Sequence, residues 1–186
     1  QPKFLDYKKD LTFGKTSNGL PVIMKQNAED KLFDLQMRYE FGNEADTRYS
    51  YAANYLDLLG TNKISAEQIK QQFYKLACNF GINVSDKNIT VSLNGLAENM
   101  PQAIALAENV LKNAKTDKAA WKNFVAMVLK NREDTKKEQR SNFAAAKAYG
   151  MYGTYNNVLT QQSAEQLKNT NPADMVALIT KLSNYK

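Results

Sequence analysis

The sequence contains no histidine in 186 residues and only one cysteine. Without an imidazole, the chain can form neither a Ser-His-Asp triad nor a Cys-His pair, and it has no imidazole metal ligand. A single cysteine also excludes an internal disulfide and any metal site built from several thiolates. We therefore expect no catalytic residue, no metal ligand and no enzymatic activity in this chain alone.

Long apolar runs are also absent. No stretch reaches membrane-spanning length, and the first residues, Gln1 to Asp6, lack the apolar core of a signal peptide. Because the chain does not begin with methionine, we expect a fragment of a larger multidomain protein. The lone thiol and the many lysines and asparagines favour the periplasm or cell envelope of a bacterium.

The composition that is present is that of an ordinary globular protein. With 43% hydrophobic and 24% charged residues, the chain is expected to form a single domain over residues 1–186. Lys and Arg exceed Asp and Glu by 25 to 19, but the densest basic run, 130–140, is interleaved with acidic residues. This is typical of a solvated helical face, so we expect no nucleic-acid partner. Three carboxylates lack the spacing of a calcium loop and are expected to be solvated, namely Glu44, Asp46 and Asp57.

Periodicity in the first half of the chain predicts strands, then helices, then a hairpin. The turn signal Ser17-Asn18-Gly19 precedes the first strand, and a capping box of Ser65 and Gln68 begins the second helix. The predicted order is strand 20–25, strand 32–41, helix 48–59, helix 65–81, and hairpin strands 82–85 and 89–96.

The second half is predicted to be helical, over 100–112, 117–148 and 172–182. Gly150 and Gly153 break the pattern before the last helix. Strands that alternate apolar and polar residues, together with helices bunched in sequence, predict an α+β fold. In it, an antiparallel or mixed sheet has its helices packed on one face.

Three motifs carry a family resemblance: Asn18-Gly19-Leu20-Pro21-Val22, Phe41-Gly42 and Leu59-Gly60-Thr61-Asn62-Lys63-Ile64-Ser65. In their order and spacing, the sequence resembles the pitrilysin/insulinase family of zinc metallopeptidases, which share a mitochondrial-processing-peptidase-like fold. The resemblance extends from about Asp10 to the last helix. It implies a metallopeptidase-like α/β roll whose final strand is expected to be missing from this chain.

Active members of that family carry an H-x-x-E-H motif on the helix before the Gly-Thr pair, and a downstream glutamate is the third zinc ligand. The resemblance places the two histidines at Tyr51 and Tyr55 and the general base at Asn54. The downstream glutamate falls on Asn131, to within about one helical turn. None of these four residues is a good zinc ligand or a general base, so the resemblance implies a catalytically silent domain from the C-terminal half of a peptidase.

The resemblance also implies a function and partners. In such families, a zinc-bearing half and a similarly folded silent half close around an unfolded peptide. This chain is then part of the peptide-enclosing chamber and packs against the active half, which lies in the same polypeptide or is a separate zinc-bearing subunit. Zinc is expected in that partner half, with no cofactor in this chain and a peptide as substrate. The substrate-binding residues are unknown at this stage.

Two alternative functions are a structural core subunit of an oligomeric complex with the same fold, and a basic nucleic-acid-binding module. An H-x-x-E-H motif upstream in the same reading frame favours the peptidase hypothesis. Co-purification with a separate chain that carries the motif favours the core subunit. Binding to nucleic acid with a steep salt dependence is expected only of the nucleic-acid-binding module.

Several side chains admit two interpretations. Tyr51, Asn54 and Tyr55 can bind a peptide backbone or pack their helix, and packing is favoured. Cys78 lies on the apolar pattern of its predicted helix, so it is expected to be a buried core thiol rather than a nucleophile. Structural packing is also favoured for three tyrosines near the glycines, Tyr149, Tyr152 and Tyr155.

Overall fold

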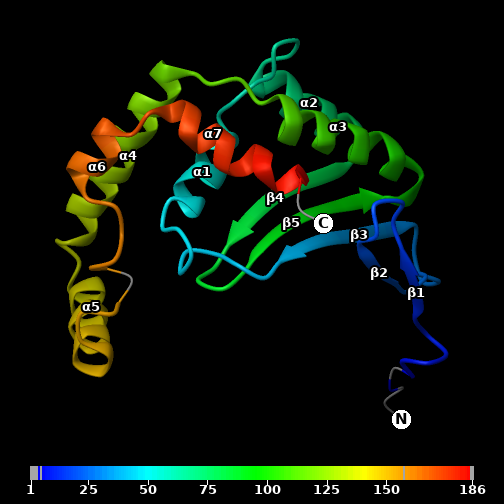
Figure 1. Ribbon diagram of the computed structural model, residues 1–186, viewed down its shortest axis with the longest axis horizontal. Helices are drawn as coiled ribbons and strands as arrows, with labels where there is room; N and C mark the ends of the chain where they lie inside the picture. Colours follow the sequence, from blue (N-terminus) through cyan, green and yellow to red (C-terminus); the bar gives the residue numbers. More distant parts are fainter. Residues whose placement is uncertain (1–3, 5, 157, 185–186) are drawn as a thin grey trace.

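The computed structural model of the chain describes residues 4, 6–156 and 158–184 (Figure 1). Its strands are β1 (Thr12–Lys15), β2 (Pro21–Met24), β3 (Leu32–Tyr39), β4 (Cys78–Val84) and β5 (Ile89–Leu96). Its α-helices are α1 (Tyr49–Leu56), α2 (Ala66–Lys75), α3 (Met100–Asn113), α4 (Lys118–Thr135), α5 (Gln139–Tyr152), α6 (Ala164–Asn169) and α7 (Pro172–Thr180). Short 3₁₀ turns follow β5 at Ala97–Asn99 and α7 at Lys181–Asn184.

The central sheet has the strand order β3-β5-β4, and both of its pairings are antiparallel. Along β5, the residues Ile89, Val91 and Leu93 are buried, while the residues between them point to the other face and are half-buried. This period-two burial is what the sequence pattern predicted. The hairpin that joins β4 to β5 is also confirmed, because Val84 pairs with Ile89.

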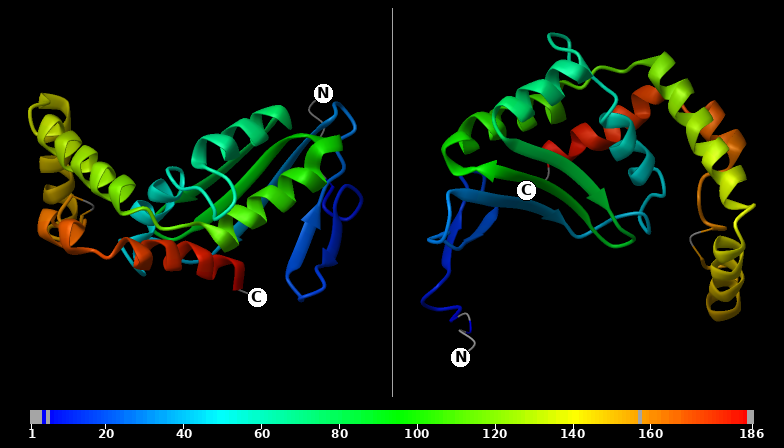
Figure 2. Two further views of the ribbon diagram at one scale, coloured as in Figure 1. Left: turned by 90° about the horizontal axis from the view of Figure 1, so that it is seen from above. Right: turned by 180° about the vertical axis from the view of Figure 1, so that it is seen from behind.

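Helices α1, α2, α3 and α7 cover one face of this sheet (Figures 1 and 2). The core lies between the two layers, and its largest fully buried side chains are Tyr55, Ile89, Leu167, Met175, Ile179, Leu182 and Val91. The opposite face of the sheet is polar, as the cross-strand hydrogen bond between Asn79 and Asn94 illustrates. The predicted α+β fold with helices on one face is therefore confirmed, and its sheet is antiparallel.

Strands β1 and β2 form a separate two-stranded hairpin beside the central sheet (Figure 1). All eight of their residues are exposed. The turn before β2 contains Gly19 at a φ of 89°, a left-handed conformation that favours glycine. The predicted turn and strand are present, but this hairpin contributes no buried residue to the core.

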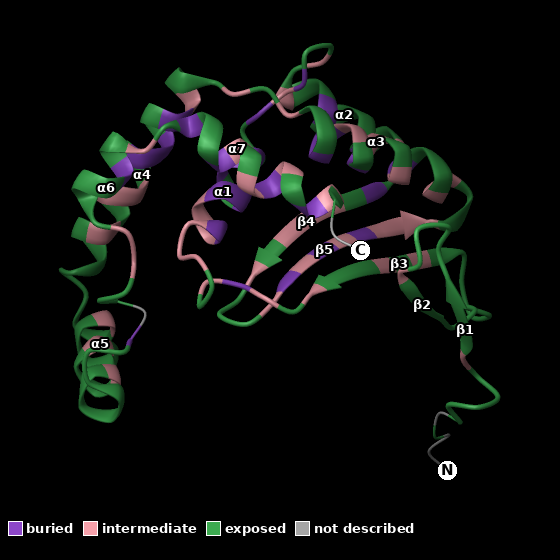
Figure 3. Ribbon diagram, viewed as in Figure 1, coloured by how far each residue is buried: buried purple, intermediate pink, exposed green. Residues whose placement is uncertain are grey.

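A helical arm extends from the other end of the sheet (Figures 1 and 3). We define the arm as residues 126–156 and 158–169, which comprise most of α4 together with α5 and α6. Helix α5 has no buried residue, whereas Leu167 of α6 is fully buried and anchors that helix. No helix in the described part of the chain is both long and apolar enough to cross a membrane.

Helix α2 ends earlier than predicted. We expected it to continue close to Gly81, but Ala77 already takes a left-handed φ of 48° and Cys78 begins β4. Cys78, Phe80 and Ile82 face inward at every second residue, which is the period of a strand. The helical spacing predicted up to Gly81 overlaps this segment, so the two patterns could not be told apart there. The Cys78 side chain is buried, as predicted, although it lies on a strand.

Helices α4 and α5 replace the single helix predicted over 117–148. Between them, the backbone N–H of Lys137 donates to the carbonyl of Asp134 at 3.0 Å, and that of Glu138 donates to the carbonyl of Thr135 at 3.1 Å. These bonds reach back three residues rather than four, so the helix tightens and ends. No glycine or proline marks this break in the sequence.

Only one of the two predicted glycine breaks is real. Gly150 lies within α5, whereas Gly153 ends that helix with a φ of 61°. The prediction for Gly150 was wrong because a helix tolerates glycine at a modest cost in free energy.

Two helices begin with a capping box. In the predicted one, the Ser65 side chain accepts from the N–H of Gln68, and the Gln68 side chain accepts from the N–H of Ser65. Ser163 and Gln166 repeat this reciprocal pair at the start of α6, which we did not predict. The same Ser-x-x-Gln spacing was the signal that would have found α6.

Candidate functional site

A cavity of about 1120 Å³ opens between helix α1 and the arm. Its walls come from α1 and the loop before it, the β4–β5 turn, α4, the end of α5 and the loop after it. The lining residues are Asn43, Glu44, Thr47, Ser50, Tyr51, Asn54, Asp57, Leu58, Asp86, Phe124, Met127, Val128, Asn131, Ala148, Tyr152, Tyr155, Asn156, Thr160 and Gln161.

Three of the four residues singled out by the resemblance line this cavity. Tyr51 and Asn54 are three residues apart on α1 and therefore share a face of the helix. Asn131 reaches the cavity from α4. The fold thus brings together side chains that are far apart in the sequence, as expected for a common site.

Tyr55 is directed into the core instead. Its side chain is fully buried, and its hydroxyl donates to the carbonyl of Asp117 at 2.6 Å and accepts from the N–H of the same residue at 3.0 Å. The ring also meets Trp121 edge-on at a centroid distance of 5.0 Å. The packing interpretation is therefore correct for Tyr55, whereas Tyr51 and Asn54 face the cavity.

Arg132 is a site residue that the sequence analysis missed. Its Nη2 donates to the Tyr51 hydroxyl at 2.6 Å, and its Nη1 donates to the carbonyl of Gln162 at 2.8 Å. The Gln162 amide donates in turn to the hydroxyl of Thr47 at 2.6 Å. This network joins α4, the start of α6 and the loop before α1. We had placed Arg132 in a solvated charged run, although it is only one residue from the predicted position of Asn131.

The hydroxyls of Ser50 and Thr47 are hydrogen-bonded to side-chain amides. The Ser50 hydroxyl donates to the side-chain carbonyl of Asn43 at 3.0 Å, and the hydroxyl of Thr47 accepts from an amide. An amide is not a general base, so neither hydroxyl is activated as a nucleophile. Across the described residues, no three His, Cys, Asp or Glu side chains come together as metal ligands.

The charged groups that line the cavity are all acidic: Glu44, Asp57 and Asp86. Burial raises the pKa of the Asp57 carboxyl, and the positive charge of Lys70 opposes this shift in part. A cavity of this kind can bind ligands through amides, aromatic rings and carboxylates.

An ion pair fixes the loop that leads into α1. The Arg48 guanidinium donates to the carboxylate of Asp46, at 2.6 Å from Nη2 and 3.0 Å from Nε. The backbone N–H of Arg48 also donates to this carboxylate, at 2.9 Å. These hydrogen bonds hold the pKa of Asp46 below its ordinary value. Asp174, at the start of α7, adds a weaker attraction to Arg48.

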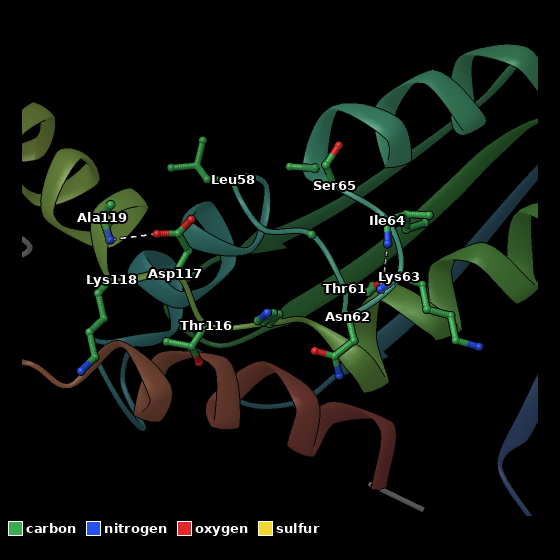
Figure 4. A pocket seen from close by; sticks show the side chains of 13 residues that line it. Leu58, Thr61, Asn62, Lys63, Ile64, Ser65, Thr116, Asp117, Lys118 and Ala119 are labelled. Atoms are coloured by element: carbon green, nitrogen blue, oxygen red, sulfur yellow. Dashed lines mark hydrogen bonds between the residues drawn. The ribbon is translucent and has the colours of Figure 1, made fainter.

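A second cavity, of about 690 Å³, lies where the Gly-Thr motif meets the start of α4 (Figure 4). A Cβ on Gly60 would lie 2.5 Å from the carbonyl oxygen of Ile64, which explains the glycine in this motif. The Asp117 side chain accepts from the N–H groups of Ala119 and Ala120, so it caps α4 as predicted. These helix-end groups are therefore already used and do not form an anion site.

The sequence matches no protein-family model and no curated protein. Among solved structures, it superposes on the periplasmic protease PqqL from Escherichia coli with a TM-score of 0.75 at 16% identity, covering 94% of this chain and 20% of that one. A peptidase M16 inactive domain from Pseudomonas fluorescens superposes with a TM-score of 0.74 at 18% identity. The match covers 90% of this chain and 42% of that one. The ferredoxin protease FusC, solved in complex with Arabidopsis ferredoxin, superposes with a TM-score of 0.78 at 14% identity. The match covers 94% of this chain and 20% of that one.

The chain therefore has the fold of domains from M16 peptidases, the group to which the pitrilysin/insulinase enzymes belong. It spans between about a fifth and two fifths of the length of these chains. One of the matching structures is itself described as an inactive domain.

Replacing Tyr55 with phenylalanine should destabilise the fold. The Tyr55→Phe variant leaves both backbone groups of Asp117 without their partner, and we expect the free energy of unfolding to fall by about 1–3 kcal/mol in urea denaturation. Tyr74→Phe is the matched control, because Tyr74 is 85% exposed and should be nearly neutral. Equal stability of the two variants would show that the Tyr55 hydroxyl contributes nothing.

The Asp46–Arg48 pair should make stability depend on pH. Because the folded pKa of Asp46 is depressed, its stabilisation is complete above the ordinary value of 3.8 and is lost as pH falls through the folded pKa. At neutral pH, Asp46→Asn should lower the free energy of unfolding by up to about 1 kcal/mol, since the Asp46 and Arg48 side chains are 23% and 40% exposed. This difference should shrink in acid. Glu29→Gln, in an exposed loop, is the control, and a constant difference at all pH values would contradict the assignment.

Proposed function

We propose that this chain is a catalytically inactive domain of a pitrilysin/insulinase-type zinc metallopeptidase. It forms part of the wall of the peptide-enclosing chamber and packs against the half that carries the zinc. The observation that carries the proposal is the content of the α1 cavity in a chain with this fold. Where the resemblance calls for ligands and a base, the cavity has Tyr51, Asn54 and Asn131, with Arg132 beside them.

The side chains around this position do not fit a zinc ion. Tyrosine and asparagine are poor zinc ligands, and the chain has no histidine. Arg132 adds a permanent positive charge that donates to the Tyr51 hydroxyl, so it would repel a divalent cation placed there. For the same reason we assign no catalytic step to this chain.

The hydrogen bonds of Arg132 also suggest what replaced the metal. A zinc site would tie α1 to α4 through ligands from both helices, and here the guanidinium joins the same two helices from α4 to the Tyr51 hydroxyl. Its centre lies 5.9 Å from the centroid of the Tyr51 ring, close enough for a cation–π attraction. We infer that this contact keeps the cavity in shape without a metal.

We place the parent protein in the periplasm or cell envelope of a bacterium. The periplasmic protease among the structures of the same fold supports this location. The partner half can lie in the same polypeptide or in a separate subunit, and zinc belongs to that half. A core subunit of an oligomeric complex is the alternative for the same fold, and we favour the peptidase because the matching structures are peptidases or peptidase domains.

Restoring the ligands tests the proposal directly. We expect a chain with Tyr51→His, Asn54→Glu, Tyr55→His and Arg132→Glu to bind about one zinc ion, measured by elemental analysis after dialysis. Because Arg132 rather than Asn131 contacts Tyr51, placing the new glutamate at 131 with Arg132 retained should give much weaker binding.

Circular dichroism of each variant establishes that it is folded, since Tyr55→His also removes the contact with Asp117. If the folded variant with all four replacements takes up no more zinc than the original chain, these positions are not the counterparts of a zinc site.

A further inference from the structure

The α1 cavity contains amide groups that the fold does not use. The side-chain amides of Asn54 and Asn131 face the cavity from α1 and α4, and both residues are exposed. Within the described part of the chain, neither amide takes part in a hydrogen bond to another residue. An amide offers both a donor and an acceptor, which is the pairing that an extended peptide backbone needs.

The carboxylates of the cavity also form no ion pair within the described part of the chain. In the described residues, none of the ion pairs involves Glu44, Asp57 or Asp86, although Lys and Arg outnumber Asp and Glu by 25 to 19 in the chain as a whole. Among the described residues, none of those that line the cavity is a lysine or an arginine. The negative charge of this groove is thus opposite in sign to the net charge of +6 of the protein.

The backbone holds two of these carboxylates in neighbouring positions. The N–H of Glu44 donates to the carbonyl of Asp86 at 2.9 Å, and the N–H of Asn43 donates to that of Ser85 at 2.9 Å. The loop before α1 is thereby joined to the β4–β5 turn. Glu44 and Asp86 are both exposed and both line the cavity, so this end of the groove carries negative charge on two elements.

The third carboxylate, Asp57, lies at the end of α1, and burial raises its pKa. Asp57 lines the cavity, and its side chain forms no ion pair within the described part of the chain, so it can meet a cationic ligand. Lys70 and Arg132 act near the cavity without lining it. Lys70 acts on Asp57 from α2, and Arg132 already donates to Tyr51 and Gln162.

Aromatic rings stand on the arm side of the groove. Tyr152 and Tyr155 line it and are 63% and 69% exposed, and Met127 of α4 also lines it, 51% exposed. Exposed tyrosine rings attract cations through their faces and cover the aliphatic stem of a long side chain. Carboxylates on one wall and rings on the other therefore match a lysine or arginine side chain better than a neutral or acidic one.

We propose that this groove binds an extended peptide segment through a lysine or arginine side chain, which lies against the wall that carries the carboxylates of Glu44, Asp57 and Asp86, opposite the rings of Tyr152 and Tyr155. The amides of Asn54 and Asn131 pair with the backbone of that segment. The inference rests on the proposed function, and it names the class of peptide that the silent domain selects. A nucleic acid does not suit the groove, because the carboxylates repel phosphate groups.

The test uses the 186-residue chain and labelled, unstructured peptides that differ at one central position. That position is lysine, arginine, norleucine or glutamate, and binding is followed by fluorescence anisotropy. We expect the lysine and arginine peptides to bind about five- to ten-fold more tightly than the norleucine peptide. The glutamate peptide should bind most weakly, and added salt should reduce the differences.

Variants locate the effect. Glu44→Gln, Asp57→Asn and Asp86→Asn, combined in one chain, should abolish the preference for lysine over norleucine while weak binding of the norleucine peptide persists. Glu67→Gln is the matched control, because Glu67 is an exposed carboxylate on α2 outside the cavity, and it should leave the preference unchanged. Unfolding curves of both variants confirm that they fold.

Equal affinity for all four peptides would overturn the charge selection and leave the chamber role intact. A preference that survives the triple replacement would place the cation elsewhere and overturn the assigned site. Absence of binding by every peptide would also overturn this inference, whereas the zinc restoration experiment judges the proposed function independently.

Discussion

The buried hydroxyl of Tyr55 joins the two helices on which the rest of this structure depends. By bonding to both backbone groups of Asp117, it fixes α1 against the start of α4 at a point that water does not reach. Because α1 is thereby fixed in rotation, Tyr51 and Asn54 face the cavity while Tyr55, Ala52 and Leu56 enter the core. A helix with one face in the core and one in a groove is the geometry that a metal-binding helix would also need.

The polar groups of the groove are held apart from the core by a contact between α4 and α1. The Arg132 guanidinium spans from α4 to α1, and it uses its donors on Tyr51 and Gln162. Because that contact joins the two helices, the remaining amides and carboxylates of the groove are not needed to hold them together. In our proposal they bind the ligand instead. The arm contributes the aromatic wall, and its helix α5 has no buried residue.

Much of the fold could be predicted because the relevant signals are local. Capping side chains such as Ser65 and Asp117, and the alternation along β5, depend only on nearby residues. Two predicted helix ends were wrong for physical reasons. Cys78 fits a helical and a strand period equally well, and α4 ends through backbone hydrogen bonds that leave no signal in the side chains. For the site, the resemblance led to Tyr51, Asn54 and Asn131. The directions of Tyr55 and Arg132 depend on tertiary contacts 62 and 81 residues away in sequence.

The central proposal is that this chain cannot hold a zinc ion and is catalytically inactive. The most direct measurement is the zinc content of the unaltered chain after exposure to zinc and dialysis, together with cleavage of an unfolded peptide by the same sample. The account predicts far less than one zinc ion per chain and no cleavage. One zinc ion per chain, with cleavage that a chelator abolishes, would contradict it.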